Sequence, residues 1–139
     1  MNERSMKKFE RLRKDFLDLQ EITEALNDEK RDLFKQKDKL YDYHFNGNDS
    51  SKQIKIIQDR INEIHYLLKL YWKKQDKVIK KLTKFFFRNL DYRTNDLDYE
   101  DETILEMFEF YLEYSIVQQG DCSSYCNLLL KERKKQEKD

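Results

Sequence analysis

The fold is decided by residues 9–40, FERLRKDFLDLQEITEALNDEKRDLFKQKDKL. Leucines recur in this stretch every seven residues, at Leu12, Leu19, Leu26, Leu33 and Leu40. A seven-residue period keeps one side chain per two turns on the same line of a helix, and that line must then lie against another helix. The stretch therefore predicts one long helix over about residues 5–44.

A polar turn and a second long helix follow. Residues 45–50 contain Asn46-Gly47, the strongest turn signal in the first ninety residues, and Ser50 or Ser51 can cap the next helix. That helix is predicted over about residues 51–91, because apolar residues again recur at heptad spacing. We call the facing heptad positions of the two helices the seam. In the first helix they are the five leucines and the residues three positions before each, Phe9, Phe16, Thr23, Lys30 and Lys37; in the second they include Ile54, Ile57, Ile61, Ile64, Leu68, Tyr71, Gln75, Val78, Leu82 and Phe85.

The C-terminal third is predicted to cover the second half of this helix. A third apolar row, formed by Trp72, Ile79 and Phe86, appears only there, which indicates that a further element packs on it. The candidate is a helix over about residues 98–118, ended by Gly120 and followed by a last helix over about residues 122–135. The predicted fold is all-α: a single domain, residues 1–139, built as a long antiparallel coiled-coil-like hairpin with two shorter C-terminal helices packed at its open end.

Composition supports a packed helical protein. Charged residues make up 40% of the chain, against about 25% in ordinary domains, and there are no prolines and only two glycines. Nine Phe, nine Tyr and one Trp argue against disorder. No stretch is apolar enough to suggest a secretion signal or a membrane span, so a cytoplasmic location without a membrane partner is expected. The Lys-, Asn-, Ile-, Phe- and Tyr-rich usage fits an AT-rich genome and suggests a small phage or mobile-element protein.

Charge is segregated along the chain although the net charge is zero. Residues 52–93 carry twelve Lys/Arg against four Asp/Glu, and residues 94–130 carry nine Asp/Glu and no Lys or Arg. One interpretation is that the two segments lie together and neutralise each other. Another is that an acidic face points outward and occupies a basic site of a partner protein; its residues are Asp96, Asp98, Glu100, Asp101, Glu102, Glu106, Glu109 and Glu113. A third is that the acids merely complement the positive N-terminus of their helix.

The basic stretch of the second helix suggests an alternative, binding of a nucleic-acid backbone. Its residues recur at helical spacing, mostly opposite the seam: Lys69, Lys73, Lys77, Lys80, Lys81, Lys84 and Arg88. A purely solubilising face has the same pattern. A second basic cluster, at residues 7–14, begins too close to the N-terminus to serve as the DNA-reading region of a leucine zipper.

No catalytic signature is present. Cys122 and Cys126 could share a helix face and join His44 or His65 around zinc, but a second close ligand pair is missing, so buried thiols are expected. There is no glycine-rich phosphate loop and no serine elbow. The sequence therefore predicts no catalytic residues, no metal and no cofactor. It favours a non-enzymatic protein-interaction module, such as an inhibitor that uses the acidic face, with nucleic-acid binding or a structural coiled-coil homodimer as alternatives.

Overall fold

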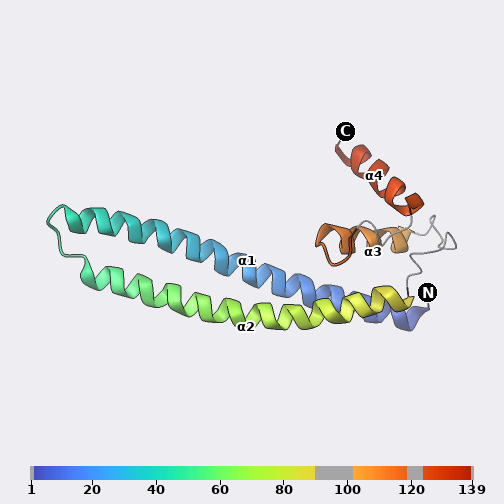
Figure 1. The fold of residues 1–139 in the computed structure, drawn as a ribbon, viewed down its shortest axis with the longest axis horizontal. Helices are drawn as coiled ribbons and strands as arrows, with labels where there is room; N and C mark the ends of the chain where they lie inside the picture. Colours follow the sequence, from blue (N-terminus) through green and yellow to red (C-terminus); the bar gives the residue numbers. More distant parts are fainter. Residues whose placement is uncertain (1, 90–101, 119–123, 139) are drawn as a thin grey trace. The chain divides into compact units, whose positions relative to one another are not determined.

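The computed structural model describes residues 2–89, 102–118 and 124–138, without the side chains of residues 124–127, 129 and 138. These residues form four α-helices: α1 (Glu3–Phe45), α2 (Ser51–Asn89), α3 (Glu102–Glu113) and α4 (Ser124–Lys138) (Figure 1). The predicted all-α fold is confirmed, because two long helices pack together and two shorter ones follow. The chain groups into unit 1, Met1–Leu12 with Ile79–Asp139, and unit 2, Arg13–Val78. The single domain stays a prediction.

Unit 2 is a hairpin in which α1 and α2 run in opposite directions (Figure 1). Its most deeply buried apolar side chains are Phe16, Ile61, Ile64 and Leu68, each at most 3% exposed. Burying a side chain of this size stabilises a fold by about 1.5–3 kcal/mol. All four residues belong to the predicted seam, so burial of its apolar side chains holds the two helices together.

The leucine row lies at the border of the seam rather than at its centre. Leu19, Leu26 and Leu33 are partly exposed, whereas Phe16 and Thr23, which belong to the other row of α1, are buried. Both rows face α2, but Phe16 and Thr23 are buried more deeply than Leu19 and Leu26. The leucine repeat therefore identifies the face of α1 that packs on α2, and Phe16 and Thr23 are the side chains that fill the interface there.

A hydrogen-bonded polar layer interrupts the apolar packing of unit 2. Gln75 is 9% exposed, and its Nε2 donates to Oε1 of Gln20 across the interface at 2.7 Å. Thr23 is 4% exposed, and its hydroxyl donates to the backbone carbonyl of Gln20 at 3.0 Å. A buried amide that loses its partner is costly, so a layer of this kind favours one alignment of the two helices over its neighbours.

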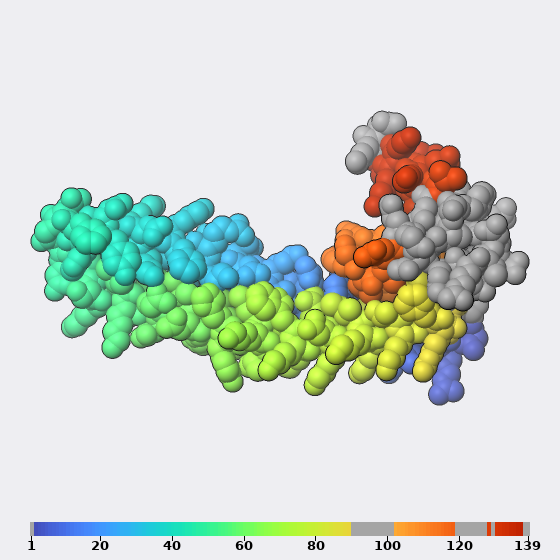
Figure 2. All heavy atoms as spheres, in the orientation of Figure 1, coloured from blue at the N-terminus to red at the C-terminus, as the bar shows by residue number. Residues whose placement is uncertain are grey.

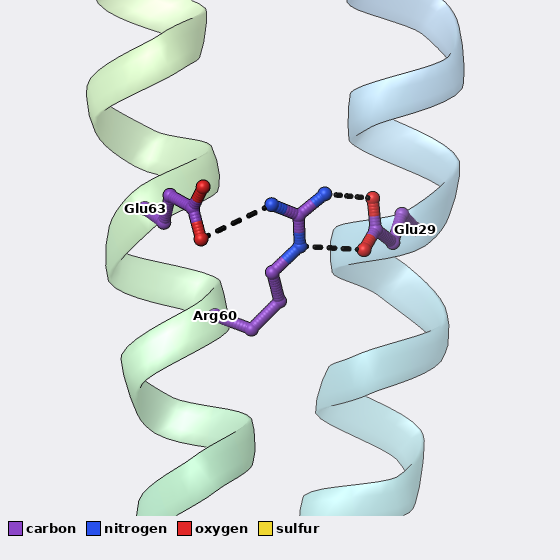
Figure 3. Close-up of polar contacts among 3 residues, drawn as sticks. All are labelled: Glu29, Arg60 and Glu63. Carbon is purple, nitrogen blue, oxygen red and sulfur yellow. Dashed lines mark hydrogen bonds and ion pairs between the residues drawn. The ribbon is translucent and has the colours of Figure 1, made fainter.

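An ion pair also joins the two helices of unit 2. Nε and Nη2 of Arg60 donate to the two carboxylate oxygens of Glu29 at 2.7 and 2.9 Å, and Nη1 lies 3.2 Å from Glu63 on α2 itself (Figure 3). The hydrogen bonds from Arg60 lower the pKa of Glu29, while burial acts weakly in the opposite direction. The two side chains are 36% and 41% exposed, so solvent screens their attraction.

A double-mutant cycle tests this pair. Since the pKa of Glu29 is lowered from 4.5, the pair stabilises the folded state above pH 4.5 and the contribution is lost as the pH falls further. Urea unfolding of Glu29→Gln, Arg60→Gln and the double variant should give a favourable coupling at about pH 7 that weakens with salt and disappears at about pH 3. The exposed intrahelical pair of Asp28 and Arg31 is the control and should couple less strongly. Equal coupling at both pH values would contradict the assignment.

The turn of unit 2 uses the predicted Asn46-Gly47. Gly47 has φ 95°, a left-handed conformation that suits glycine, and its N–H donates to the carbonyl of His44 at 3.1 Å. The side-chain amide of Asn48 donates to the carbonyl of Tyr43 at 3.2 Å. These two bonds satisfy carbonyls that the end of α1 leaves without a helical partner.

The predicted cap residue of α2 is in place, but a different side chain accepts an N–H there. Ser50 lies at the N-cap position, because its carbonyl accepts the first helical hydrogen bond from Ile54. The side chain that accepts the N–H of Ser51 is Asp49, at 3.1 Å, and this bond lowers the pKa of Asp49. A carboxylate beside a helix N-terminus is favoured by the partial positive charge there, so Asp49 serves where a serine hydroxyl was predicted.

Unit 1 has an aromatic core formed by α1, α2 and α3. The ring of Phe9 lies 5.8 Å from Phe85, 5.9 Å from Phe110 and 5.8 Å from Tyr111. Phe86 lies 5.0 Å from Tyr111, whose hydroxyl donates to the carbonyl of Leu82 at 2.8 Å. Burial raises the pKa of this hydroxyl. The expectation that the C-terminal segment covers Phe86 is confirmed.

The other two residues of the third apolar row are less buried than Phe86. Ile79 is partly buried, but Trp72, in unit 2, is 45% exposed. Helix α3 is also shorter than predicted: residues 98–101 lie outside the described residues, and the helix ends at Glu113 rather than at about residue 118.

The early end of α3 has a backbone cause. Ser115 adopts φ 55°, its N–H donates to the carbonyl of Leu112, and the N–H of Ile116 donates to Tyr111 at 2.9 Å. These bonds form a Schellman motif, a helix ending in which the left-handed residue is usually glycine. A serine there costs free energy, because its Cβ crowds the backbone.

Replacing Ser115 by glycine should stabilise the protein. Removing the Cβ relieves strain of about 1–2 kcal/mol, offset in part by the greater freedom of glycine in the unfolded chain, so a net gain of about 0.5–1 kcal/mol is expected. Thermal or urea unfolding of Ser115→Gly measures it. The control is Ser115→Ala, which keeps the Cβ and should leave stability nearly unchanged. A destabilised Ser115→Gly variant would show that the hydroxyl matters more than the backbone strain.

Helix α4 contacts α3 through Arg133. Its guanidinium lies 3.3 Å from the carboxylates of both Glu102 and Glu109, and Leu130, one turn earlier, is 3% exposed. The helix continues to Lys138, three residues beyond the predicted end. None of the four helices, over their described residues, is long and apolar enough to cross a membrane.

Candidate functional site

The basic residues predicted on α2 are all exposed. Lys69, Lys73 and Lys77 belong to unit 2, and the remaining four belong to unit 1: Lys80, Lys81, Lys84 and Arg88. Figure 2 shows long side chains projecting from the outer side of α2. Within the described residues, none of the seven cations lies within 4.0 Å of a carboxylate. Their exposure to solvent is compatible with contact to an external anion.

Two of the described carboxylates of the acidic face, Glu102 and Glu109, form ion pairs with Arg133 of α4. The neutralising cation is therefore Arg133 and not a lysine of α2. Glu109 has a side chain only 26% exposed; burial raises its pKa and Arg133 acts against this effect. The side chain of Glu102 is 73% exposed although it also pairs with Arg133. Glu106 and Glu113 are exposed. The other members of the predicted face lie outside the described residues: Asp96, Asp98, Glu100 and Asp101.

A pocket of about 700 Å³ in unit 1 brings Arg88 together with cations of α1. We call it the basic pocket; its lining is Arg4, Ser5, Lys7, Lys8, Arg11, Phe85, Arg88 and Asn89. Five of these eight residues are cationic. Among the residues that the structure describes, Glu3 pairs with this lining; it lies 3.5 Å from Lys7, and both side chains are at least 75% exposed. Such an exposed pair contributes little, so the pocket keeps a strong positive charge.

The spacing of the cations along α1 explains why they line the same pocket. Arg4, Lys8 and Arg11 are spaced by four and three residues, which puts them on one face of the helix. Phe9 and Leu12 are buried on the neighbouring face. Packing of the apolar face against the core of unit 1 therefore fixes the direction of the basic face.

Both helix ends that form the pocket are held by hydrogen bonds. Asn2 caps α1 by accepting the N–H of Ser5 at 2.8 Å. In the last turn of α2, the amide of Asn89 donates to the carbonyl of Phe85 at 3.1 Å. The hydroxyl of Ser5 donates to Oδ1 of Asn89 at 3.5 Å, which sets the start of α1 beside the end of α2.

Helix α3 covers the face of α2 next to the pocket. Phe86 lies one position beyond the pocket residue Phe85, about 100° further around the helix, and contacts Phe108 and Tyr111 of α3. Helix α3 therefore packs beside the pocket on α2 and leaves Arg88 exposed. The cations of the basic pocket lie close together beside the buried Phe85, so their positive potentials add in a region of low dielectric constant. A positive potential of this kind favours an anionic ligand.

Sequence reasoning found Arg88 but missed its partners. The sequence pattern at residues 7–14 suggested only the reading region of a zipper, and Arg4 lies outside that cluster. The spacing of Arg4, Lys8 and Arg11 was a usable signal, but joining it to Arg88 requires knowing which turn of α1 lies beside which turn of α2.

The predicted thiols cannot be placed, because Cys122 and the side chain of Cys126 lie outside the described residues. Among the residues that are described, no three His, Cys, Asp or Glu side chains lie close enough to hold a metal ion. The chain matches no known protein-family model, no characterised protein and no solved structure.

Proposed function

We propose that this protein is a non-enzymatic nucleic-acid-binding protein that contacts the phosphate backbone through the basic pocket and the neighbouring cations of α2. The observation that carries the proposal is the gathering of Arg88 with four cations of α1 around one open pocket. Exposed cations can replace the counterions of a phosphate backbone, and release of those counterions drives association.

The lining of the pocket favours backbone contact over reading of bases. Phe85 is 2% exposed, so its ring is not available for stacking on a base. Ser5 and Asn89 are the neutral polar residues of the lining, and their side chains contact each other. Arginine and lysine contacts to phosphate position a protein on nucleic acid but carry no sequence information. Binding with little sequence preference is therefore expected.

Fluorescence anisotropy with labelled duplex and single-stranded oligonucleotides tests the proposal. Affinity should fall steeply between about 50 and 200 mM NaCl. The variant Arg4→Gln/Arg88→Gln should bind at least about tenfold more weakly, and its salt slope on duplex should be smaller by about 2, since each lost phosphate contact lowers the slope by about 0.9.

A matched control removes the same charge elsewhere. Lys35 and Lys39 are exposed on α1 in unit 2, four residues apart, and Lys35→Gln/Lys39→Gln should retain near-native affinity. Circular dichroism should show unchanged helix content in both variants, since the altered side chains are exposed. An equal loss of affinity in the two variants, or no binding at low salt, contradicts the proposal.

Protein binding through the acidic face is the second candidate. Glu106 and Glu113 support it, because they are exposed on α3 and seven residues apart, on one side of the helix. A small phage-type inhibitor that occupies a basic site would use such carboxylates. If Glu106→Lys/Glu113→Lys leaves capture of a protein partner from a lysate unchanged, these residues do not form the contact.

A further inference from the structure

We propose that the basic pocket holds a run of consecutive phosphate groups from one strand, rather than a single phosphate. This inference rests on the proposed function and names the part of the nucleic acid that the pocket takes. The chemistry it recognises is a series of anionic phosphate groups along one chain. A nucleic-acid strand supplies them as phosphodiesters joined through sugars, and a free polyphosphate supplies them as directly linked groups.

Two rows of cations define the direction of the site. On α1, the row Arg4, Lys8 and Arg11 spans seven residues, or about 10 Å along the helix axis. On α2, Arg88 shares a face with Lys84 and Lys81, which lie four and seven residues before it and continue the row beyond the pocket lining.

The antiparallel pairing of the helices aligns these rows. Ser5 contacts Asn89, and one turn further along α1 Phe9 contacts Phe85. The residue numbers therefore rise on one helix as they fall on the other, and Arg4 lies at the same end as Arg88 while Arg11 lies toward Lys81. A strand that lies in the pocket and continues along the outer surface of the two packed helices would pass the cations of both rows.

The volume of the basic pocket and the number of its cations both exceed what a single phosphate group requires. A volume of about 700 Å³ is in the range of pockets that hold whole small molecules. A single phosphodiester has one negative charge and would leave most of the five lining cations without a partner. A run of phosphates neutralises several of them at once and releases more counterions, so its binding is favoured over that of an isolated phosphate.

Isothermal titration calorimetry of the full chain with two inorganic probes tests this inference. At matched ionic strength, tripolyphosphate should bind at least about tenfold more tightly than orthophosphate, which corresponds to about 1.4 kcal/mol. Arg4→Gln/Arg88→Gln should lose at least about tenfold of the tripolyphosphate affinity. Arg4→Lys/Arg88→Lys, which keeps the charges, should retain most of it, and Lys35→Gln/Lys39→Gln should match the native chain.

The outcomes separate this inference from the proposed function. If the two probes bind equally weakly while oligonucleotide binding remains sensitive to Arg4 and Arg88, the pocket does not select consecutive phosphates and only the inference fails. If tripolyphosphate binds at the pocket but oligonucleotides do not bind, the nucleic-acid function fails and a free oligophosphate is the ligand. Equal loss of tripolyphosphate binding in the pocket variant and the Lys35/Lys39 control overturns the site itself.

Discussion

Unit 1 depends on the burial of one side chain, Phe9. Its ring contacts Phe85 of α2 and both Phe110 and Tyr111 of α3, so three helices meet on a residue that is 1% exposed. Truncation of such a residue leaves a cavity and typically costs about 3–5 kcal/mol. The position of Phe9 also sets the helical phase of α1 in this unit. The same packing that forms the core therefore directs the neighbouring cations toward Arg88.

The two long helices, α1 and α2, separate apolar packing from surface charge by helix face. The deepest apolar residues of the seam are buried on both helices, and others, such as Leu19 and Leu26, are partly exposed. The charged residues on the outer faces are mostly exposed. Exposed charges contribute little to folding free energy, so they can vary with function at low cost to stability. In unit 2, Arg60 joins the helices through Glu29, and Lys37 joins them through Gln58.

Heptad spacing predicted the two long helices because it is a local property that one sequence displays directly. It also indicated Phe86 as a residue that another element covers. The end of α3 could not be predicted, since Ser115 adopts a conformation that glycine usually takes, and Gly120 offered the stronger stop signal. The basic pocket and the contacts of Arg133 depend on which turns of different helices lie together, and charge patterns alone do not contain that information.

The hydrogen bond between Gln20 and Gln75 has an evolutionary consequence. An amide at either position is tolerated in a buried layer because the other amide satisfies it, so replacing one alone leaves a polar group without its partner at a cost of about 1–3 kcal/mol. Replacing both by apolar residues of similar shape can be nearly neutral. Substitutions at residues 20 and 75 should therefore occur together in descendants of this chain, because the second substitution removes the cost of the first.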